Sequence, residues 1–495
     1  MAKKLNVLFC SCEVYPFSKE TGISDFSFSL PLALKELGND LRVMMPKYGN
    51  ISERKNRIHD INRLKEVHIP MGDTEEVAAV KSSSMTNNRN KVQAYITTNH
   101  TFYDSMKGIY HNPTTWEEYK NNDDRFIFFC KSVIQTCVLL EWYPDIIHCN
   151  DWPTAILPAM AKMLYPEKFK KTKFVYTVHS FNFQGDFPLA KTFKKTGLPE
   201  ECKEHFTHKK QFNFMKGGLM YADHITTVSK AHEDKILNDK EYSNGLNQII
   251  QDKRDSFEGI LSGMDPYAWN PKRDNHIKAK LEDEFDEFKY ENKVELCNRF
   301  ELEYHPKRPI ISMVSRIDKT KGFELLIEAI DRIMEHDLQF IILGQGETDL
   351  RKELQKIAKK YPDKFKFKVG FNDELSHIMT AGSDFFLISS EYEAIGMNYM
   401  TSSVYGTVPI ARVSGGMKEY VTPWDPETEE GNSFVFEDFT ADALYEAVER
   451  ALDAYKDSDT FETIAKNGLY EEYGWEERAV QYDKIYRNLL KSKKK

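Results

Sequence analysis

The order of strand, loop and helix is clearest in one stretch of the second half, which reads Pro309-Ile310-Ile311-Ser312-Met313-Val314-Ser315-Arg316-Ile317-Asp318-Lys319-Thr320-Lys321-Gly322. The apolar run 309–315 is typical of a strand buried on both faces of a parallel sheet. Residues 322–334 are predicted as the following helix, and the apolar run 338–343 as the next strand. Strand, helix and strand in this order predict a doubly wound, Rossmann-like unit.

The same alternation of strands and helices extends over both halves of the chain. Strands are predicted at 5–10, 40–45, 144–148, 173–178, 222–228, 365–369, 385–388 and 408–411, and helices at 24–37, 153–164 and 351–361. Strands that alternate with helices favour parallel sheets in α/β domains. The fold class predicted is therefore α/β, with two Rossmann-like doubly wound domains.

A change of composition separates these two domains. Residues 267–305 are dense in charge, for example in Pro271-Lys272-Arg273-Asp274-Asn275 and Glu282-Asp283-Glu284. We therefore predict a first domain at 1–266, a linker region at 267–305 and a second domain at 306–474. An amphipathic helix at 475–495 follows, and packing back on the first domain is one arrangement open to it.

Composition excludes several classes of protein. A chain of 495 residues with 41% hydrophobic residues buries large cores, and a formal charge of -9 gives no reason to expect a nucleic acid partner. Seven cysteines, an odd and scattered number, argue against a disulfide framework. No run approaches the roughly 20 apolar residues of a membrane span, and the N-terminus carries no signal pattern, so we expect a cytoplasmic protein with no membrane partner.

Loops that directly follow predicted strands carry cations, and ligands of doubly wound sheets bind at the carboxyl ends of strands. Arg316 and Lys321 lie between a strand and a helix, where an arginine fork and a lysine charge can converge on a diphosphate. Two solvated basic residues are the alternative. Lys19 and Gly22 precede the helix that begins near residue 24, whose N-terminus offers N–H groups to an anion. For this loop the alternative is an ordinary surface turn that contains a lysine.

Two further loops follow strands of the second half. Gly344 lies in Leu343-Gly344-Gln345-Gly346-Glu347, which lacks the third glycine of a dinucleotide fingerprint and supports only a tight turn near a nucleotide. Glu391, Glu393 and Gly396 follow the strand 385–388. Carboxylates there can hold sugar hydroxyls or stabilise positive charge at an anomeric carbon, and an exposed acidic loop is the alternative.

Three more segments end strands and carry polar or permissive residues. His148 to Asp151 and His179 do so in the first half, and a lone histidine at a strand end is more often structural than catalytic. Ser414-Gly415-Gly416 follow the strand 408–411 and suit a turn or backbone hydrogen bonds to a ligand. Neither a Ser-His-Asp spacing nor a Walker loop nor a paired-histidine metal motif is present.

Read in order along the chain, these loops closely resemble the bacterial glycogen synthases and plant starch synthases, which are retaining glucosyltransferases of the GT-B fold. The motifs that carry the resemblance are Glu13-Val14-Tyr15-Pro16-Phe17-Ser18-Lys19, Arg42 to Gly49, His148 to Trp152, Thr177 to Gly185, Asn213 to Ser229, Gly259 to Pro271, Val314 to Gly322, Ala381 to Gly396 and Gly406 to Gly416. Their shared order is far more specific than any one motif.

The resemblance implies a fold, a reaction and a set of site residues. Two domains would face a central cleft, the second would bind the nucleotide sugar, and their closure would exclude water. Glucose would pass from ADP-glucose or UDP-glucose to the non-reducing end of an α-1,4-glucan without a metal or other cofactor. The implied contacts are Lys19, Arg316 and Lys321 with the diphosphate, His179 and Glu393 with the donor glucose, Asp151 with the reaction centre, Ser414, Gly415 and Gly416 with the donor through their backbones, and Gly22, Gly344 and Gly396 in the substrate loops.

The chain departs from the family pattern in places. Where the family has K-T-G-G, this chain has Lys19-Glu20-Thr21-Gly22, and where the family has H-D-W it has Asn150-Asp151-Trp152. The stretch after Glu393 also differs, because Ala394 to Tyr399 stands where the family has P-C-G-L-T-Q. Two alternatives therefore stay open: a GT-B glycosyltransferase with another donor or acceptor, and a catalytically weak glycan-binding protein. The oligomeric state is not readable from these residues.

Overall fold

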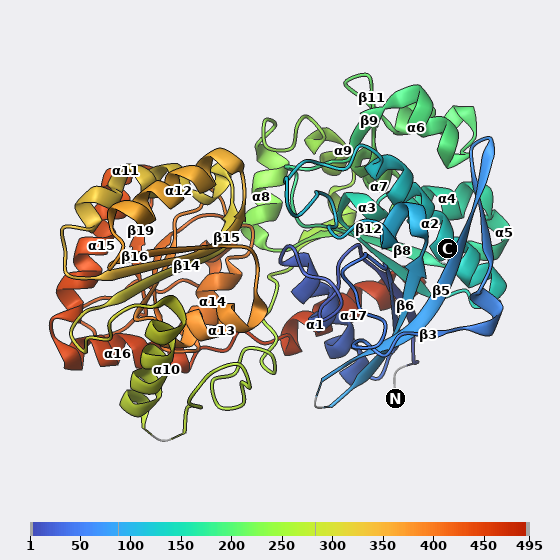
Figure 1. The fold of residues 1–495 in the computed structure, drawn as a ribbon. Coiled ribbons are helices and arrows are strands. Elements are labelled where there is room, and N and C mark those ends of the chain that lie inside the picture. Colours follow the sequence, from blue (N-terminus) through green and yellow to red (C-terminus); the bar gives the residue numbers. More distant parts are fainter. Residues whose placement is uncertain (1–2, 88, 283, 492–495) are drawn as a thin grey trace. The chain divides into compact units, whose positions relative to one another are not determined.

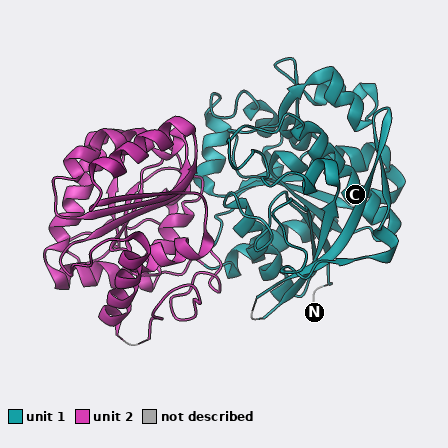
Figure 2. Ribbon diagram, in the orientation of Figure 1, with its two compact units in different colours: residues 1–263, 474–495 teal, residues 264–473 magenta. Residues whose placement is uncertain are grey.

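The computed structural model of the protein describes residues 3–87, 89–282 and 284–491. The chain folds into two compact units (Figures 1 and 2): unit 1 comprises residues 1–263 and 474–495, and unit 2 comprises residues 264–473. The described residues of the segment predicted as a linker, 267–305, all belong to unit 2, so they do not form a separate linker. The helix α10 (Phe285–Phe300) of this segment packs on α13 (Asp373–Gly382).

Unit 2 is built on a six-stranded parallel sheet with the order β16-β15-β14-β17-β18-β19. The strands are β14 (Ile310–Ile317), β15 (Gln339–Gly346), β16 (Phe365–Val369), β17 (Phe385–Ile388), β18 (Val408–Arg412) and β19 (Phe434–Phe436). In chain order this is 3-2-1-4-5-6, the order of a dinucleotide-binding fold. The strand order reverses between β14 and β17, so a ligand is expected beyond the carboxyl ends of these two strands.

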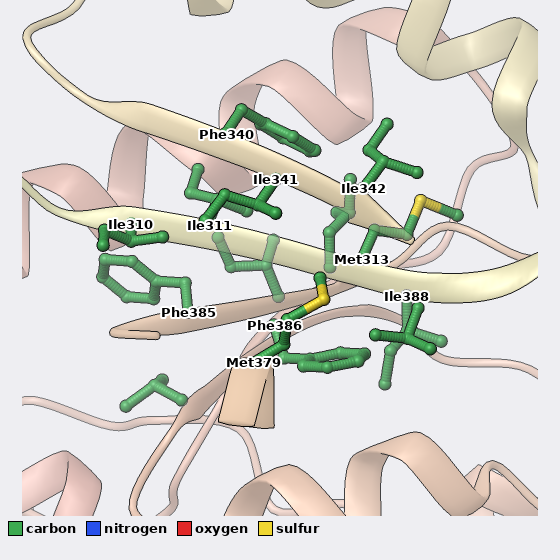
Figure 3. Packing of buried hydrophobic residues seen from close by; sticks show 14 of the residues in the cluster. Ile310, Ile311, Met313, Phe340, Ile341, Ile342, Met379, Phe385, Phe386 and Ile388 are labelled. Carbon is green, nitrogen blue, oxygen red and sulfur yellow. The ribbon is translucent and has the colours of Figure 1, made fainter. Parts of the chain in front are cut away.

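Apolar side chains on both faces of this sheet hold unit 2 together. Ile310, Ile341, Phe340 and Phe385 are 0% exposed, and Figure 3 shows them packed with their neighbours in the central strands. The helices around the sheet are α11 (Phe323–Ile333), α12 (Thr348–Lys360), α14 (Met397–Ser403), α15 (Ala441–Tyr455) and α16 (Ser458–Leu469), with α10 and α13. Burial of strands on both faces explains their continuous apolar runs.

Unit 1 contains a larger, mixed sheet with the order β13-β12-β8-β7-β1-β2-β6-β5-β3. Its strands are β1 (Asn6–Cys10), β2 (Asp40–Pro46), β3 (His59–Asp60), β5 (Thr74–Thr86), β6 (Lys91–Thr98), β7 (Ile146–Asn150), β8 (Lys173–Val178), β12 (His224–Thr227) and β13 (Phe257–Gly259), and β4 (Val67–Met71) pairs with β5. Strands β13 to β6 run parallel, whereas β5 is antiparallel to β6, β4 and β3. The order of the parallel strands reverses between β1 and β7, which makes the ends of these strands the second expected ligand position.

The helices of unit 1 surround this sheet. They are α1 (Ile23–Glu36), α2 (Asn122–Leu139), α3 (Asp151–Thr154), α4 (Leu157–Leu164), α5 (Pro166–Phe169), α6 (Leu189–Thr196), α7 (Phe214–Tyr221), α8 (Lys230–Asn238), α9 (Asn247–Asp252) and α17 (Glu476–Lys491), and a small separate sheet holds β9 (Asp186–Pro188), β10 (Thr207–His208) and β11 (Gln211–Asn213). The single helix predicted at 153–164 is wrong: it is two helices, α3 and α4. Pro158 lies in the first turn of α4, where its missing N–H suits a helix start rather than an interior.

The last helix, α17, packs against α1 within unit 1. Tyr486 of α17 lies 2.6 Å from Nδ1 of His148, and Nε2 of His148 lies 2.6 Å from Oγ1 of Thr177. His148 is completely buried and both of its ring nitrogens have partners, so it is a structural residue that attaches α17 to the sheet. Residues 492–495 of the helix predicted at 475–495 lie outside the described residues.

No helix among the described residues is long and apolar enough to span a membrane. The seven cysteines are free thiols, and all of them are buried. Cys10 ends β1, and it is also the residue at which the strand predicted at 5–10 ends.

Candidate active site

Two predicted site residues meet at the point where the strand order of unit 2 reverses. Lys321 ends the short helix η5 (Lys319–Lys321) after β14, and Glu393 lies in the loop after β17. Nζ of Lys321 is 2.5 Å from Oε1 of Glu393, and the Ser390 hydroxyl donates to the same oxygen at 2.6 Å. Only 22% of the lysine side chain and 18% of the glutamate side chain is exposed, so the ion pair is shielded from much of the solvent. A positive and a negative group thus share the expected ligand position.

Close backbone contact between the two loops brings these side chains together. Gly322 has φ +72°, and a Cβ at this position would lie 2.1 Å from the carbonyl oxygen of Ser389. The Glu391 N–H donates to the Thr320 carbonyl at 2.8 Å, and the Ser389 hydroxyl donates to the Lys321 carbonyl at 3.0 Å. Glycine is required at position 322 because any side chain would push the β17 loop away.

Arg316 also lies at this end of β14, but on the strand and not in the loop that follows it. The prediction that strand 309–315 ends before Arg316 is therefore wrong. Pairing of β14 with β15 continues through Arg316 and Gln345, so the backbone stays extended beyond the apolar run. Nε of Arg316 donates to Oδ2 of Asp318 at 2.5 Å.

Asp318 organises the short helix that carries Lys321. Its Oδ1 accepts hydrogen bonds from Thr320 N at 2.9 Å and from Thr320 Oγ1 at 2.5 Å. Burial alone would raise the pKa of Asp318, but Arg316, the Thr320 hydroxyl and Lys321 together hold it below its usual value. The arginine thus bonds this ionised carboxylate directly, and the lysine interacts with it through its charge.

The segment Ser414 to Gly416 holds the backbone of Glu393. The Glu393 N–H donates to Oγ of Ser414 at 3.1 Å, and the Gly416 N–H donates to the Glu393 carbonyl at 2.9 Å. Gly415 has φ +53°, and a Cβ there would lie 2.1 Å from the same carbonyl. The sequence predicted contacts with a ligand for these residues, and the structure adds that they position Glu393.

Close packing accounts for the two remaining glycines of unit 2. Gly344 lies within β15, so the prediction that it follows a strand is wrong, and a Cβ there would be 2.4 Å from the Ser315 carbonyl of β14. Gly396 caps α14 with φ +89°, and a Cβ there would be 2.3 Å from Cγ of Met417. Both positions require glycine for the course of the backbone.

In unit 1, Asp151 and His179 lie together at the ends of β7 and β8. Oδ1 of Asp151 accepts the His179 N–H at 3.0 Å, and Nε2 of His179 lies 3.2 Å from Oδ1 of Asn150. Burial raises the pKa of Asp151 to about 7, although the N–H groups of His179 and Ser180 lower it. Burial lowers the pKa of His179 to about 3, so its imidazole is neutral. A neutral imidazole can bond a hydroxyl group without adding positive charge.

The loop after β1 carries Lys19 and Gly22 and is built around a buried carboxyl group. Nζ of Lys19 is 3.0 Å from Oδ1 of Asp25 in the first turn of α1. Gly22 precedes α1 with φ −66°, and a Cβ there would meet no atom within 4 Å. Glu13, which is 0% exposed, accepts hydrogen bonds from the backbone of Glu20 at 2.9 Å and of Thr21 at 2.8 Å. The space beside Gly22 leaves room for a ligand at the N-terminus of α1.

Sequence reasoning gave no role to two residues that now belong to the description of the site. Glu13 was part of the family motif, and its position just after an apolar strand was the available clue. Phe371 follows β16 and is 50% exposed, and the neighbouring Gly370 N–H donates to the Gly344 carbonyl of β15 at 2.9 Å. An exposed aromatic ring at the carboxyl edge of a doubly wound sheet offers a stacking surface for a planar ring of a ligand.

Among residues 3–87, 89–282 and 284–491, no group of three or more histidine, cysteine, aspartate or glutamate side chains is arranged to hold a metal ion.

Comparison with known proteins shows the family of the chain. A family described as "Starch synthase catalytic domain" matches residues 6–252, and one described as "Glycosyl transferases group 1" matches residues 297–468. The chain is 34% identical over 490 residues to a glycogen synthase of Chlorobaculum parvum, with 99% of each chain covered. It is 33% identical over 497 residues to a glycogen synthase of Bacillus cereus, with 98% of this chain and 100% of the relative covered.

Solved structures support the fold. The catalytic domain of starch synthase IV from Arabidopsis thaliana, bound to ADP and acarbose, superposes with a TM-score of 0.89 at 24% identity, covering 99% of this chain and 100% of that one. The predictions of an α/β fold of the GT-B type, of the family and of a glycosyltransferase are confirmed. The chain belongs to the glycogen and starch synthase family and is a glucosyltransferase that uses a nucleotide-linked glucose as its donor.

Proposed function

We propose that this protein transfers glucose from ADP-glucose, with retention of configuration, to the non-reducing end of an α-1,4-glucan. The observation that carries the proposal is the ion pair of Lys321 with Glu393 at the ends of β14 and β17. The choice of ADP-glucose over UDP-glucose is supported by the starch synthase IV structure, whose description names ADP.

The cations stabilise the leaving diphosphate in this proposal. Arg316 binds phosphate oxygens through its guanidinium fork, while Lys321 and Lys19 add single charges. Negative charge grows on the diphosphate as the bond to glucose breaks, so the prearranged Arg316 and Lys321 stabilise the transition state more than the ground state, whereas Lys19 contributes to binding of the donor in both states. The reaction then needs no metal ion to neutralise the leaving group.

The carboxylates and the histidine act on the sugar. Positive charge develops at the anomeric carbon during transfer, and a charged imidazole nearby would oppose it. His179 is held neutral by burial and can bond a glucose hydroxyl without this penalty. Glu393 holds the donor glucose and Asp151 supplies negative charge at the reaction centre. We also place the reaction in the cytoplasm, because seven free thiols suit a reducing compartment.

The proposal is tested by incubating the purified protein with glycogen and either ADP-glucose or UDP-glucose, with and without EDTA, and measuring release of the nucleoside diphosphate. We expect kcat/KM for ADP-glucose to exceed that for UDP-glucose by at least about 10-fold, because the two donors differ only in contacts to the base. EDTA should leave the rate unchanged. Faster release from UDP-glucose would refute the donor choice. Glycogen binding without release from either donor would favour the glycan-binding alternative.

Phe371 provides a second prediction about the donor. Base stacking on an aromatic side chain contributes about 1–3 kcal/mol, so Phe371→Ala should raise the KM for the donor about 10-fold while kcat changes less than about 2-fold. Val369→Ala, at a neighbouring residue that is 43% exposed, is the matched control and should leave both constants unchanged. Equal KM values for Phe371→Ala and the wild type would show that the base binds elsewhere.

A further inference from the structure

The turn between β1 and α1 differs from the family pattern at Thr21, where the family has glycine. The Thr21 hydroxyl donates to Oε1 of Glu13 at 2.6 Å and accepts the Ile23 N–H at 3.2 Å. The Thr21 N–H donates to Oε2 of Glu13 at 2.8 Å. A glycine could make only the last of these three bonds, so two of them are specific to the threonine side chain.

The partner of Thr21 is a carboxyl group that needs these bonds. Glu13 is 0% exposed, and burial raises its pKa to about 7, although the hydroxyl and N–H of Thr21 and the N–H of Glu20 lower it. The Thr21 hydroxyl is the donor to Oε1 of Glu13 among the residues that the structure describes. A buried acceptor that loses its donor costs about 1–3 kcal/mol, so the interaction restrains the turn strongly.

Thr21 also contacts the first residues of α1, the helix whose N-terminus would receive the phosphate. Ile23 is the first residue of α1, and the Ser24 N–H donates to the Thr21 carbonyl at 3.3 Å. Thr21 therefore joins a buried acid of the core to the first turn of α1. Lys19 precedes this junction and is itself paired with Asp25 of α1, and Gly22 follows it.

Glu20, the second departure from the family pattern, has its own partners. Its carboxylate accepts the Ile109 N–H at 3.3 Å and lies 3.8 Å from Nδ1 of His111. The added negative charge is thus engaged with the loop that contains residues 109–111, and both departures contribute bonds to the turn.

We propose that Thr21 is a positioning residue: bonded to Glu13, it holds the turn from Lys19 to Gly22 in the conformation that receives the donor diphosphate. This inference rests on the proposed function of that turn. A turn that hydrogen bonds already hold in one conformation loses less conformational entropy when its ligand binds. It therefore binds the ligand more tightly than a flexible turn would. Thr21 touches no reacting atom in this proposal and acts through Lys19 and the start of α1.

Two substitutions at this position separate the hydroxyl from the size of the side chain. Thr21→Val keeps the shape and removes the hydroxyl, and Thr21→Ser keeps the hydroxyl. We expect Thr21→Val to raise the KM for ADP-glucose about 10-fold with kcat within about 2-fold, because the turn contacts the donor before and during the reaction. Thr21→Ser should stay within about 2-fold of the wild type in both constants, and the KM for glycogen should be unchanged in every variant. Binding of ADP, measured by calorimetry, should weaken in parallel with the rise in KM.

A matched control removes a similar bond far from the turn. The Thr460 hydroxyl donates to Oδ2 of Asp457 at 2.6 Å at the start of α16, and Thr460→Val should leave all constants unchanged. If Thr21→Val does not fold, Thr21→Gly decides the question, because it restores the family residue and should also raise the KM for the donor.

The outcomes distinguish this inference from the function on which it rests. A wild-type protein that transfers glucose, together with an unchanged KM and ADP affinity in Thr21→Val and Thr21→Gly, would overturn the role of Thr21 alone. Equal defects in Thr21→Ser and Thr21→Val would also overturn it, since the hydroxyl would then not matter. A wild-type protein that releases no diphosphate from either donor would instead remove the proposed function.

Discussion

Lys321→Ala is expected to lower kcat/KM for glucosyl transfer about 1,000-fold. One part of the loss is the charge that stabilises the leaving diphosphate, and removing one such group commonly costs 100- to 1,000-fold. The other part is Glu393, whose carboxylate lies 2.5 Å from the lysine and would be left without its cation. An uncompensated negative group at this place repels the diphosphate as well.

The control for this prediction lies two residues earlier in the same short helix. Lys319 is 71% exposed and lies 4.0 Å from a carboxylate oxygen of Glu324, so Lys319→Ala should change kcat/KM less than about 2-fold. The rates are measured as diphosphate release with glycogen as acceptor, and circular dichroism checks that both variants are folded. Near-normal activity of Lys321→Ala would remove this lysine from the site.

The activity lost on replacing Glu393 should depend on whether Lys321 is present. If Lys321 and Glu393 act as a unit, the double variant Lys321→Ala/Glu393→Gln loses less activity than the product of the two single losses. This comparison is part of the same experiment and separates an ion pair that acts on the donor from two groups that act independently.

The parallel strands of both units could be predicted closely from the sequence. The strands predicted at 173–178, 365–369 and 385–388 coincide with β8, β16 and β17. Strands buried on both faces are continuous apolar runs, which stand out from their surroundings. Strands β4 and β5, which pair antiparallel with each other, escaped prediction; in β4, for example, buried and exposed residues alternate and no continuous apolar run forms.

The limits of the strands near the site were harder to predict. Arg316 and Gly344 lie beyond the apolar runs of β14 and β15, yet each is still paired with a residue of the neighbouring strand. Hydrogen bonds between backbones set where a strand ends, and side-chain type reports them only indirectly. The same reason explains why Thr21, in the sequence alone, suggested weakened catalysis. Its bonds to Glu13 depend on a turn that no pattern of residues describes.

Asp151→Asn is expected to lower kcat about 100- to 1,000-fold and, at the same time, to stabilise the protein at neutral and higher pH. The backbone should tolerate the change, because Asp151 has φ +55° and asparagine adopts this left-handed region more readily than most residues. The amide oxygen can still accept the His179 N–H. What the variant loses is the negative charge proposed for the reaction centre.

The effect on stability follows from the raised pKa of Asp151. Burial raises this pKa from 3.8 to about 7. Between these two values the unfolded chain has released the proton that the folded protein keeps, so the free energy of unfolding falls as pH rises through this window. Above pH 7 the free energy of unfolding is lowered by the full amount, and a pKa shift of this size corresponds to about 4 kcal/mol. Asparagine does not ionise, so it does not lower the free energy of unfolding in this way at any pH.

Urea unfolding of the wild type and Asp151→Asn at pH 5 and pH 8 measures the difference. The stability of the variant relative to the wild type should rise by up to about 3 kcal/mol between these pH values. Asp363→Asn, at an exposed position after α12, is the control and should show no such rise. A variant that is inactive yet gains relative stability at pH 8 cannot owe its inactivity to unfolding. A variant that keeps its activity would show that the charge of Asp151 is not needed for transfer, and a pH-independent stability difference would show that the carboxyl group is ionised freely in the folded protein.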